Sequence, residues 1–160
     1  MNKETLALVA VVSIGINLFK APQPFEATTL EERAAAVNMT VEDFELMSDV
    51  VEAESNRSTD GDLTGRIYIA LVIFNRVEDD RFNCDDVREV LTAPGQFSTV
   101  RRGQCNCADR TDYSDQAIIE AYEWIQSGED VPEVYFFNCR SYFSGRTAVG
   151  EYGGNYFSGF

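Results

Sequence analysis

Histidine is absent from this 160-residue sequence. The absence excludes the Ser-His-Asp and Cys-His nucleophile pairs in their usual form, and it excludes zinc sites that use imidazole ligands. Glycine-rich loops that bind phosphates or dinucleotides are missing as well, so the sequence gives no support for nucleotide chemistry. We therefore expect neither a cofactor nor a metal. If the protein is an enzyme, carboxyl and hydroxyl groups must carry the reaction.

Basic residues are scarce, with two lysines and 13 lysines and arginines in total against 27 acidic residues, for a net charge of −14. Contacts with nucleic-acid phosphates need clusters of lysine and arginine, so we expect no nucleic-acid partner. An anionic membrane surface is disfavoured as the main partner for the same reason. An anionic polymer remains a candidate substrate if arginines line the cleft or salt screens the repulsion.

Long apolar runs are limited to residues 5–19, which follow Lys3. The run is shorter than the ~20 residues of a membrane span but is typical of a signal sequence. We expect export, with residues 1–20 as a signal or membrane anchor and the protein facing the periplasm or cell wall. Ordinary cleavage of the segment and a buried core helix are the alternatives. Residues 21–39 are predicted to form a linker and a short helix, and residues 40–160 the main domain.

A predicted helix opened by Thr40 carries Phe44, Met47, Val51 and Glu54 on one stripe. Glu54 is therefore expected to point into the protein. Burial and the negative end of the helix dipole both disfavour the ionised carboxylate, so we expect this side chain to hold its proton near neutral pH. A general acid has this property. The alternative is an ordinary solvent-exposed glutamate at a helix end.

The stretch 65–77 is apolar on nearly every face, which predicts the central buried helix of the domain. A polar loop joins it to the helix that carries Glu54 and would rim a cleft between them. Shorter helices followed by a small sheet indicate an α+β fold. These elements are a helix at 30–37, a brief helix capped by Asp85 or Asp86 that runs to Leu91, and a helix at 114–127 ended by Gly128. A β-prone segment at 134–137 and a hairpin at 149–157 that turns at Gly153-Gly154 follow.

Four cysteines, Cys84, Cys105, Cys107 and Cys139, form an even set in a chain that looks exported. This favours two disulfides. A bond between Cys105 and Cys107 would be strained, which predicts that Cys84 and Cys139 each pair with one of them. A zinc site made of all four cysteines is the alternative.

Five short motifs together resemble the cell wall hydrolases of the spore cortex-lytic enzyme type, and they occur in the order of that family. They are VEAES at 51–55, ALVIFNRV at 70–77, PGQFS at 94–98, VYFFN at 134–138 and GNYF at 154–157. The resemblance implies a mainly helical, lysozyme-like domain with a small C-terminal antiparallel sheet. It also implies cleavage of the peptidoglycan glycan strand between N-acetylmuramic acid and N-acetylglucosamine.

The resemblance further implies roles for individual residues. Glu54 matches the catalytic glutamate, and Ser98 matches a hydroxyl residue in the loop that faces it. The substrate-binding residues would be Gln96, Phe97, Tyr135 and Asn138. Three features depart from the family pattern: a longer loop after Glu54, Tyr156 in place of a histidine, and the cysteine-rich stretch 103–110.

The reaction implied by the resemblance is that of a lytic transglycosylase, which needs a single acid. Hydrolysis with a second carboxylate, for which Asp60 and Asp62 are the candidates, is an alternative. A non-catalytic peptidoglycan-binding or structural protein of a virion or envelope, with the same fold, is another. Spore germination, wall growth and phage entry or lysis are alternative settings for the activity.

Overall fold

The computed structural model describes residues 28–55, 63–101, 104–105 and 110–160. The predicted signal or anchor segment lies outside these residues, as do Asp60, Asp62 and Cys107. Within the described part of the chain, no helix is long and apolar enough to cross a membrane.

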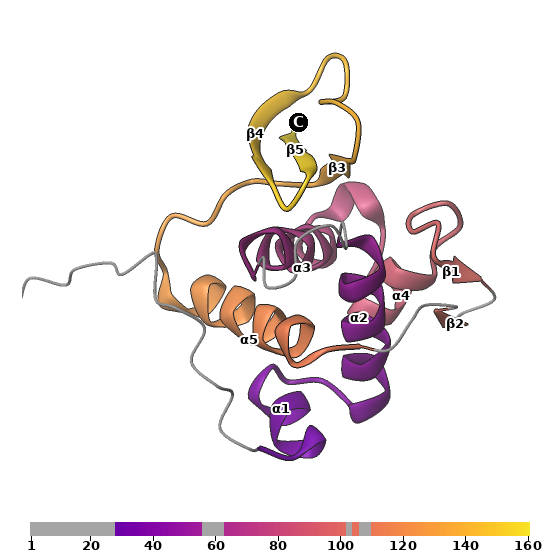
Figure 1. Ribbon diagram of the computed structural model, residues 1–160, viewed down its shortest axis with the longest axis vertical. Helices are drawn as coiled ribbons and strands as arrows, with labels where there is room; N and C mark the ends of the chain where they lie inside the picture. Colours follow the sequence, from indigo (N-terminus) through magenta and orange to yellow (C-terminus); the bar gives the residue numbers. More distant parts are fainter. Residues whose placement is uncertain (1–27, 56–62, 102–103, 106–109) are drawn as a thin grey trace, which may run out of the picture.

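Five α-helices build the larger part of the described residues: α1 (Leu30–Ala36), α2 (Val41–Glu54), α3 (Leu63–Glu78), α4 (Val87–Thr92) and α5 (Asp112–Ser127). A short 3-10 helix, η1 (Asp80–Phe82), follows α3. Helix α3 is central and packs against α2, α4 and α5 (Figure 1). Its residues Ile69, Leu71 and Ile73 are fully buried, so the prediction of a central buried helix is confirmed.

The helix ends follow local capping chemistry that the sequence predicts well. The Thr40 hydroxyl accepts a hydrogen bond from the Asp43 amide at 3.1 Å, which opens α2. Gly128 ends α5 with φ of +72°, a left-handed conformation that favours glycine. Helix α5 begins earlier than predicted, because Ser114 is not its N-cap. The Ser114 hydroxyl instead accepts from the amide of Thr111, so Ser114 belongs to the first turn.

A three-stranded antiparallel sheet forms the C-terminal part, with β3 (Phe136–Asn138), β4 (Thr147–Tyr152) and β5 (Asn155–Gly159) in the order β3-β5-β4. Gly153 and Gly154, with φ of +57° and +75°, make the β4–β5 turn where the sequence predicts it. A ribbon of β1 (Val100–Arg101) and β2 (Gln104–Cys105) is an addition that the sequence did not indicate. Helices followed by a small sheet confirm the α+β fold.

The sheet is fixed to the first half of α3. The Tyr68 ring stacks on Tyr152 with centroids 4.1 Å apart and also contacts Phe157 at 5.3 Å. Gly65 lies against the β4–β5 turn, where an added Cβ would stand 2.8 Å from the Cα of Gly153. This close approach places the sheet above α3 and beside the C-terminal end of α2 (Figure 1).

The predicted disulfide pairing is wrong. Cys84 and Cys139 are both free thiols, although Cys105 is disulfide-bonded. The two free cysteines lie in different surroundings, because the Cys84 thiol donates to the Phe82 carbonyl after η1 while Cys139 is exposed at the end of β3. An even count says nothing about which sulfurs come within bonding distance. Because the Cys105 sulfur is in a disulfide, it is not available as a thiolate ligand, which excludes a zinc site that uses all four cysteines.

Candidate active site

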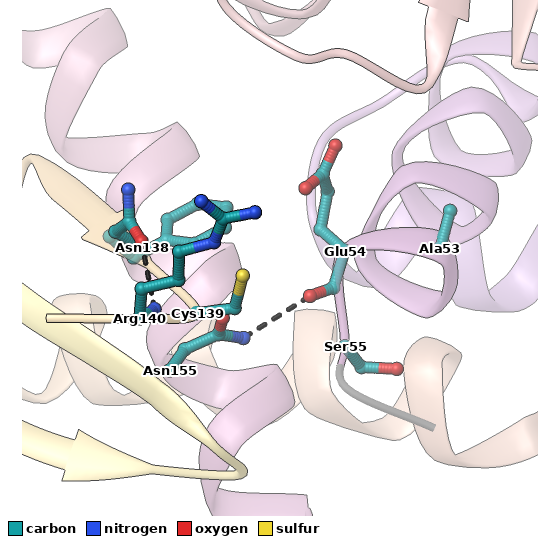
Figure 2. Close-up of a pocket in the computed structure, with 8 residues that line it drawn as sticks. Ala53, Glu54, Ser55, Asn138, Cys139, Arg140 and Asn155 are labelled. Carbon is teal, nitrogen blue, oxygen red and sulfur yellow. Dashed lines mark hydrogen bonds between the residues drawn. The ribbon is translucent and has the colours of Figure 1, made fainter. Parts of the chain in front are cut away.

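A cavity of about 610 Å³ opens between the C-terminal end of α2 and the sheet. Figure 2 shows one wall made by the end of the helix and the facing wall made by the segment that leaves β3. The lining residues are Ala53, Glu54, Ser55, Phe137, Asn138, Cys139, Arg140 and Asn155. The structure thus brings together Glu54 and Asn138, two of the residues that the sequence predicts for the site.

Glu54 is the last residue of α2, and contacts from two distant segments fix it. Its carbonyl oxygen accepts a hydrogen bond from the side-chain amide of Asn155 at 3.2 Å (Figure 2). Asn155 is 3% exposed at the start of β5, so this contact satisfies one carbonyl of the helix end with a buried donor. The carboxyl Oε1 accepts from the Thr99 hydroxyl at 2.8 Å. The side chain therefore has a defined direction into the cavity.

Glu54 is half-buried, and the buried carboxylate of α2 is Glu52 instead, which is 6% exposed. Arg66 donates to both oxygens of Glu52, from Nε at 3.1 Å and from Nη2 at 3.0 Å, and the Thr111 hydroxyl donates at 2.8 Å. Burial acts to raise the pKa of Glu52, but the hydrogen bonds from Arg66 and Thr111 hold that pKa below its ordinary value. Glu54 therefore lies at the cavity, half-buried, and Glu52 makes the buried ion pair of this helix.

The loop between α4 and β1 approaches the site with a different residue from the one predicted. Ser98 is exposed, and the hydroxyl group that reaches Glu54 belongs to the next residue, Thr99. Phe97 is 4% exposed and lies in the core against Phe137, with ring centroids 6.4 Å apart. Gln96 is outside the cavity lining, and its side-chain oxygen accepts from Arg76 Nη1 at 2.7 Å. The structure therefore does not bring Gln96, Phe97 or Ser98 into the cavity.

Two polar residues near the end of α3 hold the segment before β3. Asn75 donates to the carbonyl groups of Pro132 at 3.0 Å and Val134 at 2.9 Å. Arg76 donates to the carbonyl of Tyr135 from Nε at 2.9 Å and from Nη2 at 2.6 Å. Burial lowers the pKa of Arg76 to about 10. The Asn-Arg pair therefore positions the segment that leads to the far wall of the cavity.

Tyr135 contributes its backbone to this arrangement, while its ring points elsewhere. The ring stacks on Phe82 at 5.8 Å and contacts Phe160 at 4.9 Å. It lines a second, smaller pocket with Asn75 and residues 78–80. The predicted substrate contact of Tyr135 is therefore not in the cavity beside Glu54.

Sequence reasoning missed Cys139, Arg140 and Asn155, which line the cavity, and Thr99, whose hydroxyl group binds the Glu54 carboxyl group. Figure 2 shows the Arg140 guanidinium extending toward the Glu54 carboxyl group across the open space. Among the described residues that line the cavity, Glu54 is the one carboxylic acid and Arg140 the one cation. No group of three or more acidic or cysteine side chains in the described part of the chain is placed to hold a metal.

Comparison with known proteins agrees with this architecture. The sequence profile of the Cell Wall Hydrolase family matches residues 60–158, a range that begins just after Glu54 and covers α3 to β5. The fold is similar to the crystal structure of the catalytic domain of the Bacillus cereus SleB protein, with a TM-score of 0.58 and 24% sequence identity. That match covers 74% of this chain and 91% of the other. No curated protein matches the sequence significantly.

Proposed function

Because the chain belongs to the cell wall hydrolase family, we propose that it cleaves peptidoglycan glycan strands between N-acetylmuramic acid and N-acetylglucosamine, with Glu54 as the acid. The observation that carries the proposal is the placement of this one carboxyl group, oriented by Thr99, in an open cavity. Peptidoglycan lies outside the cytoplasmic membrane, so the site of action is extracytoplasmic.

The proposed chemistry is that of a lytic transglycosylase. The Glu54 carboxyl group gives its proton to the glycosidic oxygen, and the bond from that oxygen to C1 of the muramic sugar breaks. The resulting carboxylate then takes the proton of the 6-hydroxyl group on the same sugar, whose oxygen bonds to C1 and closes a 1,6-anhydro ring. The proton count balances, and no water is consumed.

Two features of the site support this route over hydrolysis. Ordinary glycoside hydrolysis uses a pair of carboxylates on either side of the bond, and the described lining of the cavity offers Glu54 alone. Thr99 binds Oε1 of Glu54, which leaves Oε2 available for the glycosidic oxygen.

The test is Glu54→Gln, which keeps the shape of the side chain and removes the acid. We expect release of soluble glycan fragments to fall by about 100-fold or more, while binding to purified sacculi is retained. Glu45→Gln is the matched control, because Glu45 lies on the same helix and pairs with Arg110 at the surface. Full activity in Glu54→Gln would remove the assignment.

Mass spectrometry of the wild-type products separates the reaction types. Products with 1,6-anhydro ends support the transglycosylase route, whereas reducing ends point to hydrolysis with a second carboxylate. Asp60 and Asp62, which lie outside the described residues, would then be the candidates. Binding to sacculi without any release of fragments would instead identify a binding or structural protein.

A further inference from the structure

Arg140 gives the cavity a positive charge that the rest of the chain does not predict. The protein carries a net charge of −14, so it repels an anionic polymer at long range. Arg140 is exposed, lines the cavity, and directs its guanidinium into the open space that faces Glu54 (Figure 2). A single cation at this position changes the local charge where a substrate would bind.

The guanidinium of Arg140 makes no ion pair or hydrogen bond with any described residue. Five other arginines of the described chain do form ion pairs: Arg33, Arg66, Arg81, Arg88 and Arg110. The backbone of Arg140 is nevertheless fixed, because its N–H donates to Asn138 Oδ1 at 2.8 Å. Asn138 closes β3, which pairs with β5. The side chain is thus held at the cavity by the sheet while its five donors remain available.

We propose that Arg140 forms a carboxylate-binding subsite that recognises an acidic group of the glycan substrate beside the cleaved bond. A guanidinium matches a carboxylate in a bidentate fork, and such charge-assisted hydrogen bonds are stronger than neutral ones. The proposal rests on the proposed function, since it assigns a specificity to the same cavity. It predicts a preference for strands whose carboxyl groups are free.

Two sources can supply this carboxylate on peptidoglycan. The first is the lactyl group of a muramic sugar that has lost its stem peptide, and this group sits on the ring whose C1 is attacked. The second is a carboxyl group of the stem peptide itself. Both present the same chemistry to Arg140, so the experiment needs substrates that carry one source at a time.

Binding is measured with the full chain carrying Glu54→Gln, with and without Arg140→Gln, so that turnover does not interfere. Three soluble ligands are compared: strands stripped of peptide, the same strands with the lactyl carboxylates converted to methylamides, and strands that keep their peptides. We expect Arg140→Gln to weaken binding of a free-carboxylate ligand by about tenfold and to change binding of the amidated strands less than about twofold. Arg140→Lys should retain part of the affinity because it keeps the charge.

Arg88→Gln is the control for the loss of one positive charge. Arg88 pairs with Asp43 near the start of α2, and Glu54 ends that helix about 16 Å away along its axis. Loss of affinity for stripped strands assigns the subsite to the lactyl group, and loss for peptide-bearing strands assigns it to the peptide. Equal loss on amidated strands, or the same loss in Arg88→Gln, would overturn the subsite.

The two proposals fail in different ways. If the wild type cleaves the strands and Arg140→Gln changes the binding of none of the three ligands, the glycan-cleaving function stands and the subsite is removed. Binding that depends on Arg140, without any release of fragments by the wild type, keeps the subsite and removes the enzymatic assignment. Absence of binding to all three ligands overturns both.

Discussion

Replacing Glu52 by glutamine tests whether Glu52 is a structural carboxylate, in contrast to Glu54 on the same helix, which we propose to be the acid. Glu52 and Arg66 are 6% and 5% exposed, and Arg66 donates to both carboxyl oxygens. Thr111, the residue before α5, donates to the same group. The interaction therefore joins the end of α2 to the start of α3 and to the residue before α5.

The expected loss in unfolding free energy for Glu52→Gln is about 3 kcal/mol. Breaking a buried ion pair by removing one partner costs about 3–5 kcal/mol, and the lower end applies because the glutamine oxygen still accepts a hydrogen bond. Glu54→Gln is the matched comparison two residues further along the helix. Glu54 is half-buried, and we expect that change to cost less than about 1 kcal/mol.

The pH dependence follows from the sign of the shift. The pKa of Glu52 is lower in the folded protein than the value of about 4.3 for an unfolded chain. The ionised side chain therefore makes its full contribution to the free energy of unfolding above about pH 5. The contribution is lost as the pH falls through 4 toward the folded-state pKa. The stability difference between the wild type and Glu52→Gln should therefore narrow below about pH 4.

Urea unfolding followed by the fluorescence of Trp124 measures both effects. At a slope of about 2 kcal/mol per molar urea, the expected loss lowers the midpoint for Glu52→Gln by about 1.5 M at pH 7. A loss under 1 kcal/mol, or an equal loss in Glu54→Gln, would refute the reasoning. A difference that stays constant from pH 7 to pH 3 would contradict the linkage to ionisation.

Two further predictions concern the cavity and its support. Thr99→Val removes the hydrogen bond to Glu54 and should lower the rate of fragment release by about tenfold, with Thr99→Ser retaining activity. Ser98→Ala should leave the rate of fragment release unchanged. A loss as large as that in Thr99→Val would contradict the assignment of Thr99 as the hydroxyl residue that binds Glu54. Gly65→Ala places a methyl group 2.8 Å from Gly153 Cα and should cost about 2 kcal/mol in urea unfolding. An unchanged midpoint would show that the β4–β5 turn moves aside freely.

The elements of the fold were predictable from local patterns. The run that became α3 is apolar on nearly every face, and Thr40 and Gly128 mark helix ends through chemistry confined to one turn. The Gly153-Gly154 turn between two β-prone runs is likewise local. Such signals act over a few residues, so one sequence is enough to read them.

The identity of the residues around the cavity depends on contacts between distant segments. Glu52 and Glu54 look alike in the sequence, and the partner that buries the first, Arg66, belongs to the next helix. Whether Ser98 or Thr99 meets Glu54 depends on one residue of register in a loop. Arg140 follows β3 in a polar turn, where no periodicity indicates the direction of a side chain.

The hydrogen bond from Asn155 to the Glu54 carbonyl joins positions 101 residues apart. Closing so long a loop is costly in entropy, and the helices can form from nearer contacts before the sheet arrives. During synthesis on the ribosome, the chain would therefore carry its acidic side chain for a long interval without the opposite wall of the cleft. The second wall of the cavity would therefore be completed only after β5 has emerged and docked against the end of α2.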